Sequence, residues 1–127
     1  MPPAKPRQAS AADRAAVLTK ATLRAATQLG MTSKSLATVI GVSEATVSRM
    51  HSGDYLLQRG QKPFELAVLF VRLYRSLDAI VGGDDSVAGL WLKNRNTALN
   101  AEPIALIQTV PGLMNVIQYL DARRAVV

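Results

Sequence analysis

One short stretch of the chain places small, polar and basic side chains where they could read a nucleic acid. A helix over residues 43–52 would have one face opposite the apolar Val47. That face consists of Ala45, Ser48, Arg49 and Ser52, with Thr46 at its edge. Short side chains let a helix approach the major groove closely, and Arg49 can fork onto a guanine edge or a phosphate. The pattern therefore favours DNA recognition, with Arg49 making the largest single contribution.

Residues at two predicted helix starts extend this contact. Ser43 and Glu44 begin the reading helix, and residues 32–34 begin the helix before it, where free backbone amides can hold phosphates. The residues expected to contact DNA are Thr32, Ser33, Lys34, Ser43, Glu44, Ala45, Thr46, Ser48, Arg49 and Ser52.

The surrounding residues fit a helix-turn-helix over residues 33–53. Ser33 or Ser35 can cap a first short helix, and Leu36 and Ile40, four apart, give it one apolar stripe. The features that place the turn and the second helix are Ala37 at a close crossing, Gly41 where a positive φ is needed, Val42 in the turn, Ser43 as N-cap, and Val47 and Met50 facing the core. The alternative is a helical hairpin that only packs. Such a hairpin needs neither the Ala37, Gly41 and Val42 pattern nor side chains this small on its outer face.

Charge is unevenly distributed along the 127 residues, whose formal net charge is +6. Residues 1–60 hold eight Lys/Arg against three acids, whereas residues 61–127 hold seven against six. The half that contains the helix-turn-helix is thus the half that could neutralise phosphates.

Composition excludes several classes of protein. The absence of cysteine excludes disulfides, a thiolate nucleophile and zinc fingers, and His51 alone gives no histidine-based metal site. A Gly-rich phosphate loop and paired His/carboxylate spacing are also missing, so we expect neither an enzyme nor a cofactor. No apolar run is long enough for export or membrane spanning, and a reducing cytoplasm is the expected setting.

Helical periodicity runs through almost the whole chain, which predicts an all-α fold of about seven helices. Outside the helix-turn-helix, the expected helices cover residues 11–29, 63–81, 87–93, 104–109 and 113–123, with a loop over 94–101. We expect a disordered basic tail over 1–10, a DNA-binding domain over 11–60 and a second domain over 61–127. The helix over 63–81 is apolar on more than half its surface, which predicts packing against its own chain and a second copy.

The C-terminal half resembles the toxin-binding domain of the Xre/MbcA/ParS antitoxins over roughly residues 64–127. The resemblance rests on Trp91-Leu92, Asn96, Leu99, Pro103, Leu106-Ile107, Thr109, Gly112, Val116 and Tyr119-Leu120. An Xre-type helix-turn-helix before such a domain is similar to the antitoxins paired with RES-domain toxins. The resemblance implies a type II system in which the antitoxin blocks an NAD-consuming toxin and represses its own operon as a dimer or larger assembly. The chain departs from the family pattern at Arg95, where a proline is common, and at Asn100-Ala101, where glycines are common.

The end of the chain is the expected toxin contact. Asp121, Arg123 and Arg124 precede an apolar end at Val127, with no later segment to bury them. We expect the last helix and tail to approach the toxin's active-site entrance, although a solvated C-terminus fits the same residues. Trp91 and Leu92 are interpreted as core and Asn96 as a loop cap.

A second function class also fits the helix-turn-helix. A stand-alone repressor could bind a small molecule through its C-terminal half, with the wide apolar helix lining the pocket. A toxin gene beside this one would favour the antitoxin.

Overall fold

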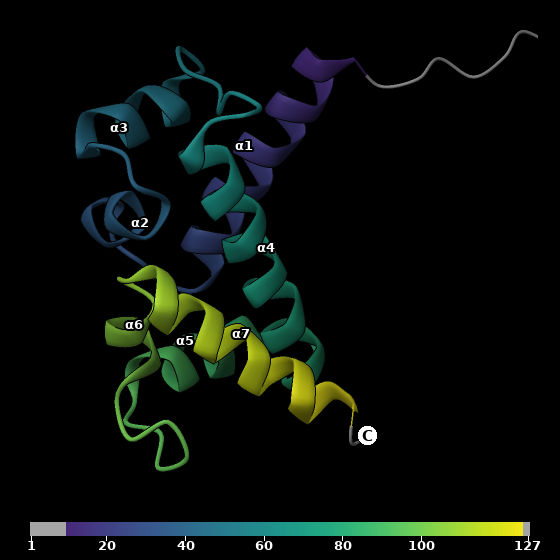
Figure 1. The fold of residues 1–127 in the computed structure, drawn as a ribbon, viewed down its shortest axis with the longest axis vertical. Coiled ribbons are helices and arrows are strands. Elements are labelled where there is room, and N and C mark those ends of the chain that lie inside the picture. Colours follow the sequence, from purple (N-terminus) through teal and green to yellow (C-terminus); the bar gives the residue numbers. More distant parts are fainter. Residues whose placement is uncertain (1–9, 126–127) are drawn as a thin grey trace, which may run out of the picture.

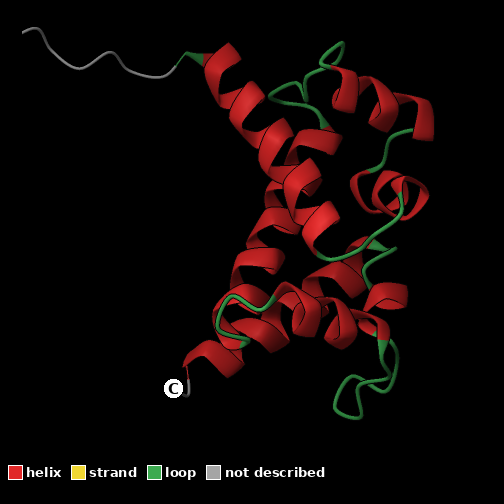
Figure 2. Ribbon diagram, turned by 180° about the vertical axis from the view of Figure 1, so that it is seen from behind, coloured by secondary structure: helices red, strands yellow, loops and turns green. Residues whose placement is uncertain are grey.

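A computed structural model describes residues 10–125, and within that range the chain is all-α (Figures 1 and 2). Its seven helices are α1 (Ala11–Gln28), α2 (Ser33–Ile40), α3 (Glu44–Ser52), α4 (Lys62–Ile80), α5 (Asp85–Lys93), α6 (Pro103–Leu106) and α7 (Val110–Ala125). The predicted fold class and number of helices are confirmed. Val127 and the predicted tail, apart from Ser10, lie outside the described residues.

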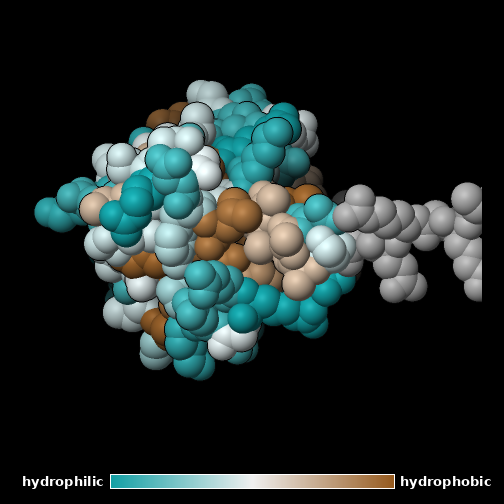
Figure 3. All heavy atoms as spheres, turned by 90° about the horizontal axis from the view of Figure 1, so that it is seen from above, coloured by the Kyte–Doolittle hydropathy of each residue, from teal (hydrophilic) through white to brown (hydrophobic). Residues whose placement is uncertain are grey.

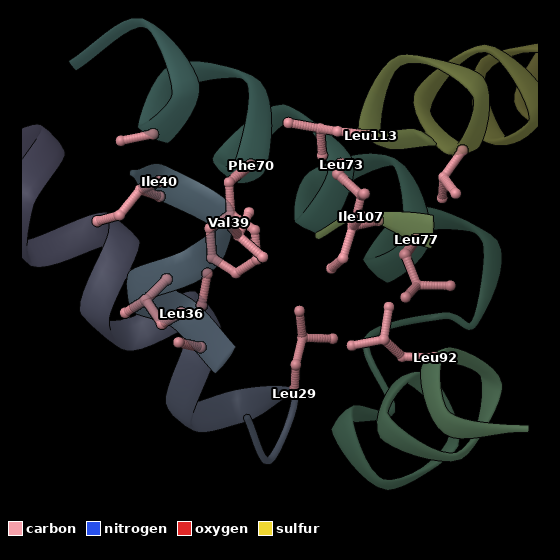
Figure 4. Close-up of a cluster of buried hydrophobic side chains, with 14 of the residues drawn as sticks. Leu29, Leu36, Val39, Ile40, Phe70, Leu73, Leu77, Leu92, Ile107 and Leu113 are labelled. Atoms are coloured by element: carbon pink, nitrogen blue, oxygen red, sulfur yellow. The ribbon is translucent and has the colours of Figure 1, made fainter. Parts of the chain in front are cut away.

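The central helix is α4, which packs against α1 and α2 on one side and against α7 on the other (Figure 1). One hydrophobic core runs through both halves of the chain. Figure 4 shows it around Phe70 of α4, with Leu36 from α2, Leu92 from α5 and Leu113 from α7. All four of these side chains are fully buried, so the packing of each half depends on the other.

Most of the wide apolar surface of α4 is covered by its own chain. The predicted packing of this helix against its own chain is confirmed, since α7, far away in sequence, returns to lie across α4. Packing against a second copy stays a prediction for the part of the helix that remains exposed. The large apolar side chains of α4 that remain exposed are Val68 and Ile80.

The long N-terminal helix is fixed at its start and in its middle. Ser10 and Asp13 form a capping box, in which each side chain accepts a hydrogen bond from the other's backbone N–H at 3.1 Å. Hydrogen bonds from the Ser10 backbone N–H and, secondarily, the Ser10 hydroxyl to the Asp13 carboxylate hold its pKa below the ordinary value of 3.8. Further along α1, the buried Thr19 hydroxyl accepts the Leu57 backbone N–H at 3.0 Å. This bond ties the segment after α3 to α1.

The last helix begins earlier than its sequence suggested. Residues 111–112 were expected to break the chain before a helix over 113–123, but α7 starts at Val110 and includes Pro111. Proline is tolerated in the first turn of a helix because its missing N–H needs no partner there. Thr109 caps this turn, since its hydroxyl accepts the Gly112 N–H at 3.2 Å. The short helix before it covers residues 103–106 and not 104–109.

Candidate functional site

The turn between α2 and α3 has the geometry that its residues predict. Gly41 ends α2 with a φ of 75°, in the left-handed region. The N–H groups of Gly41 and Val42 both donate to the Ala37 carbonyl oxygen, at 2.9 and 3.0 Å. Ala37 itself is buried, which agrees with its predicted place at a close crossing. The cap of α2 is Thr32 and not Ser33 or Ser35, because the Thr32 hydroxyl accepts the Ser35 N–H at 3.0 Å.

A chain of hydroxyl groups orients Arg49 on α3. Ser43 caps α3 by accepting the Thr46 N–H at 3.0 Å, and the two hydroxyl groups are also 3.0 Å apart. The Arg49 Nη2 then donates to the Thr46 Oγ1 at 3.0 Å. The guanidinium is thereby held over the exposed side of α3, with other N–H groups left to form further bonds.

Thr46 does not lie where the sequence placed it. We expected it at the edge of the exposed face, but it is buried, because it precedes the core residue Met50 by one helical turn. With its hydroxyl between Ser43 and Arg49, Thr46 positions Arg49 and does not itself face outward.

The other predicted DNA contacts lie at the start of α2 and along α3, and all of them are exposed. The exposed residues are Thr32, Ser33, Lys34, Ser43, Glu44, Ala45, Ser48, Arg49 and Ser52. Ser52 donates to the Arg49 carbonyl oxygen at 3.1 Å and lies 3.0 Å from an Asp54 carboxylate oxygen. Two helix N-termini and one oriented guanidinium are thus exposed, and each of them suits a polyanion.

The C-terminal half contacts the first turn of α2 through the side chain of Gln108. The Gln108 side-chain amide donates to the Ser35 hydroxyl at 3.0 Å and to the Ile104 carbonyl oxygen at 3.1 Å. Ser35 lies in the first turn of α2, next to the exposed residues 32–34. The two halves are therefore joined by a polar contact as well as by the core.

The predicted toxin contact at the end of the chain is divided between two sides of α7. Asp121 faces α4, where it accepts the Ser76 hydroxyl at 3.0 Å and forms an ion pair with Arg72. Arg124 donates to the same Ser76 at 3.2 Å. The expectation that Asp121 reaches freely toward a partner is therefore wrong, because α4 lies beside it and holds its carboxylate.

Arg123 lies on the opposite flank of α7, toward α5. Its guanidinium carbon is 5.8 Å from the centre of the Tyr119 ring, and that ring stacks on Trp91 at 6.3 Å. Trp91 and Tyr119 are half-buried, so Trp91 is only partly the core residue that we expected, whereas Leu92 is fully buried. The sequence did carry a signal for this flank, since the apolar residues 87, 90 and 91 share one helix face.

An open groove of about 770 Å³ lies between α1, α4 and α7. The exposed Val17 and Val68, at 69% and 46% of full exposure, face it from α1 and α4. Its charged lining consists of Asp13, Arg14, Arg72, Arg75, Asp121 and Arg124. Figure 3 shows an apolar area beside the point where the described chain begins, bounded by hydrophilic surface.

Residues 10–125 contain no group of three or more acidic or histidine side chains that could hold a metal ion. None of the described helices is long and apolar enough to cross a membrane.

Comparison with known families accounts for both halves. Residues 8–72 match the antitoxin Xre-like helix-turn-helix domain, and residues 76–125 match the antitoxin Xre/MbcA/ParS C-terminal toxin-binding domain. The first match continues into α4, beyond the division that we expected after residue 60. A search of curated proteins found no match to the chain. The chain belongs to the Xre-like helix-turn-helix antitoxins, and its C-terminal half is a toxin-binding domain of the Xre/MbcA/ParS type.

Proposed function

We propose that the chain is the antitoxin of a type II system that neutralises a RES-domain, NAD-consuming toxin and represses its own operon. The observation that carries the proposal is the position of two surfaces. The exposed face of α3 and the outer side of α5 and α7 lie toward opposite ends of the long axis (Figures 1 and 2). Because the two surfaces are separate, operator DNA and a toxin can be bound by the same molecule.

Operator binding is proposed through α3 in the major groove, with the start of α2 on the phosphates. Arg49 is the central residue, since Thr46 holds its guanidinium outward. Arg49→Glu should weaken operator binding by a factor of about 5–150 in a gel-shift assay, because a bidentate base contact contributes about 1–3 kcal/mol. The control is Arg95→Glu, an equal change of charge in the loop before α6. Equal affinity of the Arg49 variant and the parent chain would contradict the assignment.

Dimerisation is proposed at the groove between α1, α4 and α7. Val17 and Val68 are exposed there, and a second copy would remove both from water. Val17→Glu and Val68→Glu should each lower the mass of the free chain measured by light scattering, whereas Val110→Glu, at another exposed valine, should not. A two-fold dimer would also require an inverted repeat with half-sites about one helical turn apart, or a multiple of it. If all three variants keep the mass of the parent chain, this interface is excluded.

Toxin neutralisation is proposed for the half that matches the toxin-binding domain, with Arg123 and Val127 at the contact, while Arg124 lies on the α4 flank with Ser76. Co-expression with a RES-domain protein encoded beside this chain should restore growth and keep cellular NAD at its normal level. Purification should yield a complex whose mass gives the stoichiometry. The match over residues 76–125 favours this function over a repressor that responds to a small ligand. Toxicity that persists on co-expression, with no complex recovered, would reject the RES-domain assignment.

A further inference from the structure

An apolar stripe on the outer side of α5 has no cover from the described chain. Val87 is 45% exposed and Leu90 is 57% exposed, although both lie in a helix whose inner residues Ala88 and Leu92 are fully buried. The spacing of 87, 90 and 91 places Val87 beside both Leu90 and Trp91 on the helix surface. Exposed leucine and valine beside a tryptophan form a more continuous apolar surface than scattered single residues do.

The stripe continues onto α7 through stacked aromatic rings. The Trp91 and Tyr119 ring centres are 6.3 Å apart with an angle of 16° between the planes. Arg123 lies over Tyr119, one helical turn further on, and its Nη1 is 3.4 Å from the phenol oxygen. Each side chain restricts the next, so a partner that binds here would order few additional rotatable bonds.

We infer that Val87, Leu90, Trp91, Tyr119 and Arg123, together the α5–α7 face, dock on the toxin, against an apolar patch that presents a carboxylate to Arg123. The inference rests on the proposed function and names the surface that performs it. Every residue of the α5–α7 face lies inside the range that matches the toxin-binding domain. Tryptophan, tyrosine and arginine are also the residues that most often dominate the energy of protein interfaces.

Charge distinguishes the toxin from a second copy of this chain as the occupant. Arg123 is the one charged residue of the α5–α7 face, because Asp121 points to the other flank of α7 and is paired with Arg72 there. In a two-fold contact through this face, neither copy would offer Arg123 an acid from the face as a partner. A toxin surface with a carboxylate supplies that partner.

Leu90→Glu tests the α5–α7 face without disturbing the core, because Leu90 is exposed. The control is Leu56→Glu, the same substitution at a leucine that is 41% exposed in the helix-turn-helix half. Titration calorimetry with a catalytically inactive RES-domain toxin should show at least a thirtyfold loss of affinity for the Leu90 variant and less than a threefold change for the Leu56 variant. Arg123→Glu should also weaken binding, and Arg123→Lys should restore most of it.

Trp91 is the only tryptophan of the chain and supplies a second measurement. Full-length protein labelled with fluorotryptophan should give one fluorine resonance that shifts when unlabelled toxin is added. An unchanged resonance in a complex that forms, or a Leu90 variant that binds as tightly as the parent chain, would overturn the inference and leave the proposed function standing. A Leu90 variant that loses only self-association would overturn it too. Failure of the parent chain to bind the toxin would reject both.

Discussion

At the residue scale, Gly112 shows why the first turn of α7 accepts only glycine at this position. A Cβ atom added to Gly112 would lie 1.8 Å from the Leu106 carbonyl oxygen, far closer than nonbonded atoms approach. The Thr109 hydroxyl accepts the Gly112 N–H and donates to the Leu106 carbonyl oxygen at 3.5 Å, so it joins the two backbone segments. The spacing of Thr109 and Gly112, two of the residues that carry the family resemblance, therefore has a steric basis: the threonine caps the helix and the glycine permits the close approach.

Gly112→Ala should destabilise the fold by at least about 3 kcal/mol, because the clash is with backbone and one segment must move. Gly82→Ala is the matched control. Gly82 has a φ of 65° but open space around its Cβ position, so its substitution should cost only about 1–2 kcal/mol of conformational strain. Urea denaturation of the two variants separates the cost of the steric clash from the cost of the strained backbone conformation. Equal losses in both would mean that the backbone around Gly112 relaxes freely.

Tyr74 makes the free energy of unfolding depend on pH in the alkaline range. Its phenol donates to an Asp85 carboxylate oxygen at 3.1 Å, and burial together with this bond raises the pKa of Tyr74 to about 12. Because the pKa is raised in the folded chain, the contribution to stability is complete below pH 10 and is lost as the pH rises toward 12. Tyr74→Phe should flatten the dependence of the unfolding free energy on pH in that range, and Tyr119→Phe should leave it in place. Absorbance titration should show the high phenol titration disappearing only in the Tyr74 variant.

At the element scale, the helix-turn-helix could be predicted because its signals are local. Gly41, Ser43 and the spacing of Val47 and Met50 act within one or two helical turns, and each has the role that was expected. The orientation of Asp121 could not be predicted, because it depends on Ser76 and Arg72 of α4, more than forty residues earlier. Short-range patterns carry no information about such a partner. For the same reason the aromatic stack between α5 and α7 was not anticipated.

Thr19 gives a test of how the segment after α3 is held on α1. Its buried hydroxyl donates to the Ala15 carbonyl oxygen at 2.7 Å and accepts the Leu57 N–H. Thr19→Val keeps the shape but leaves that N–H without a partner, so we expect a loss of about 1–3 kcal/mol and faster hydrogen exchange at Leu57. Thr27→Val should change stability little, since the Thr27 hydroxyl is exposed and bonds only within α1, to Leu23. Exchange at Leu57 that stays as slow as in the parent chain would argue against this bond.

At the scale of the whole molecule, α4 belongs to both functional halves. The helix-turn-helix match ends at residue 72 and the toxin-binding match begins at residue 76, so they meet inside this helix. Its one side buries Phe70 with Leu36 of α2, and its other side packs on α7 (Figure 4). A chain cut after residue 60 would thus lose α4 and expose the core of the DNA-binding half. The halves are distinct in function but share one core.

A shared core predicts one unfolding transition for both halves. Leu36→Ala, in the helix-turn-helix, removes a fully buried side chain and should destabilise the chain by about 2–5 kcal/mol. Trp91 reports on the other half, so its fluorescence should follow the same urea curve as the circular dichroism of the helices, and both midpoints should move together in the variant. Thr38→Ala, at an exposed position of α2, should leave both midpoints nearly unchanged. Should the Trp91 curve keep the midpoint of the parent chain while the helical signal shifts, α4 would be transmitting no stability between the halves, and DNA and toxin would be bound by independent domains.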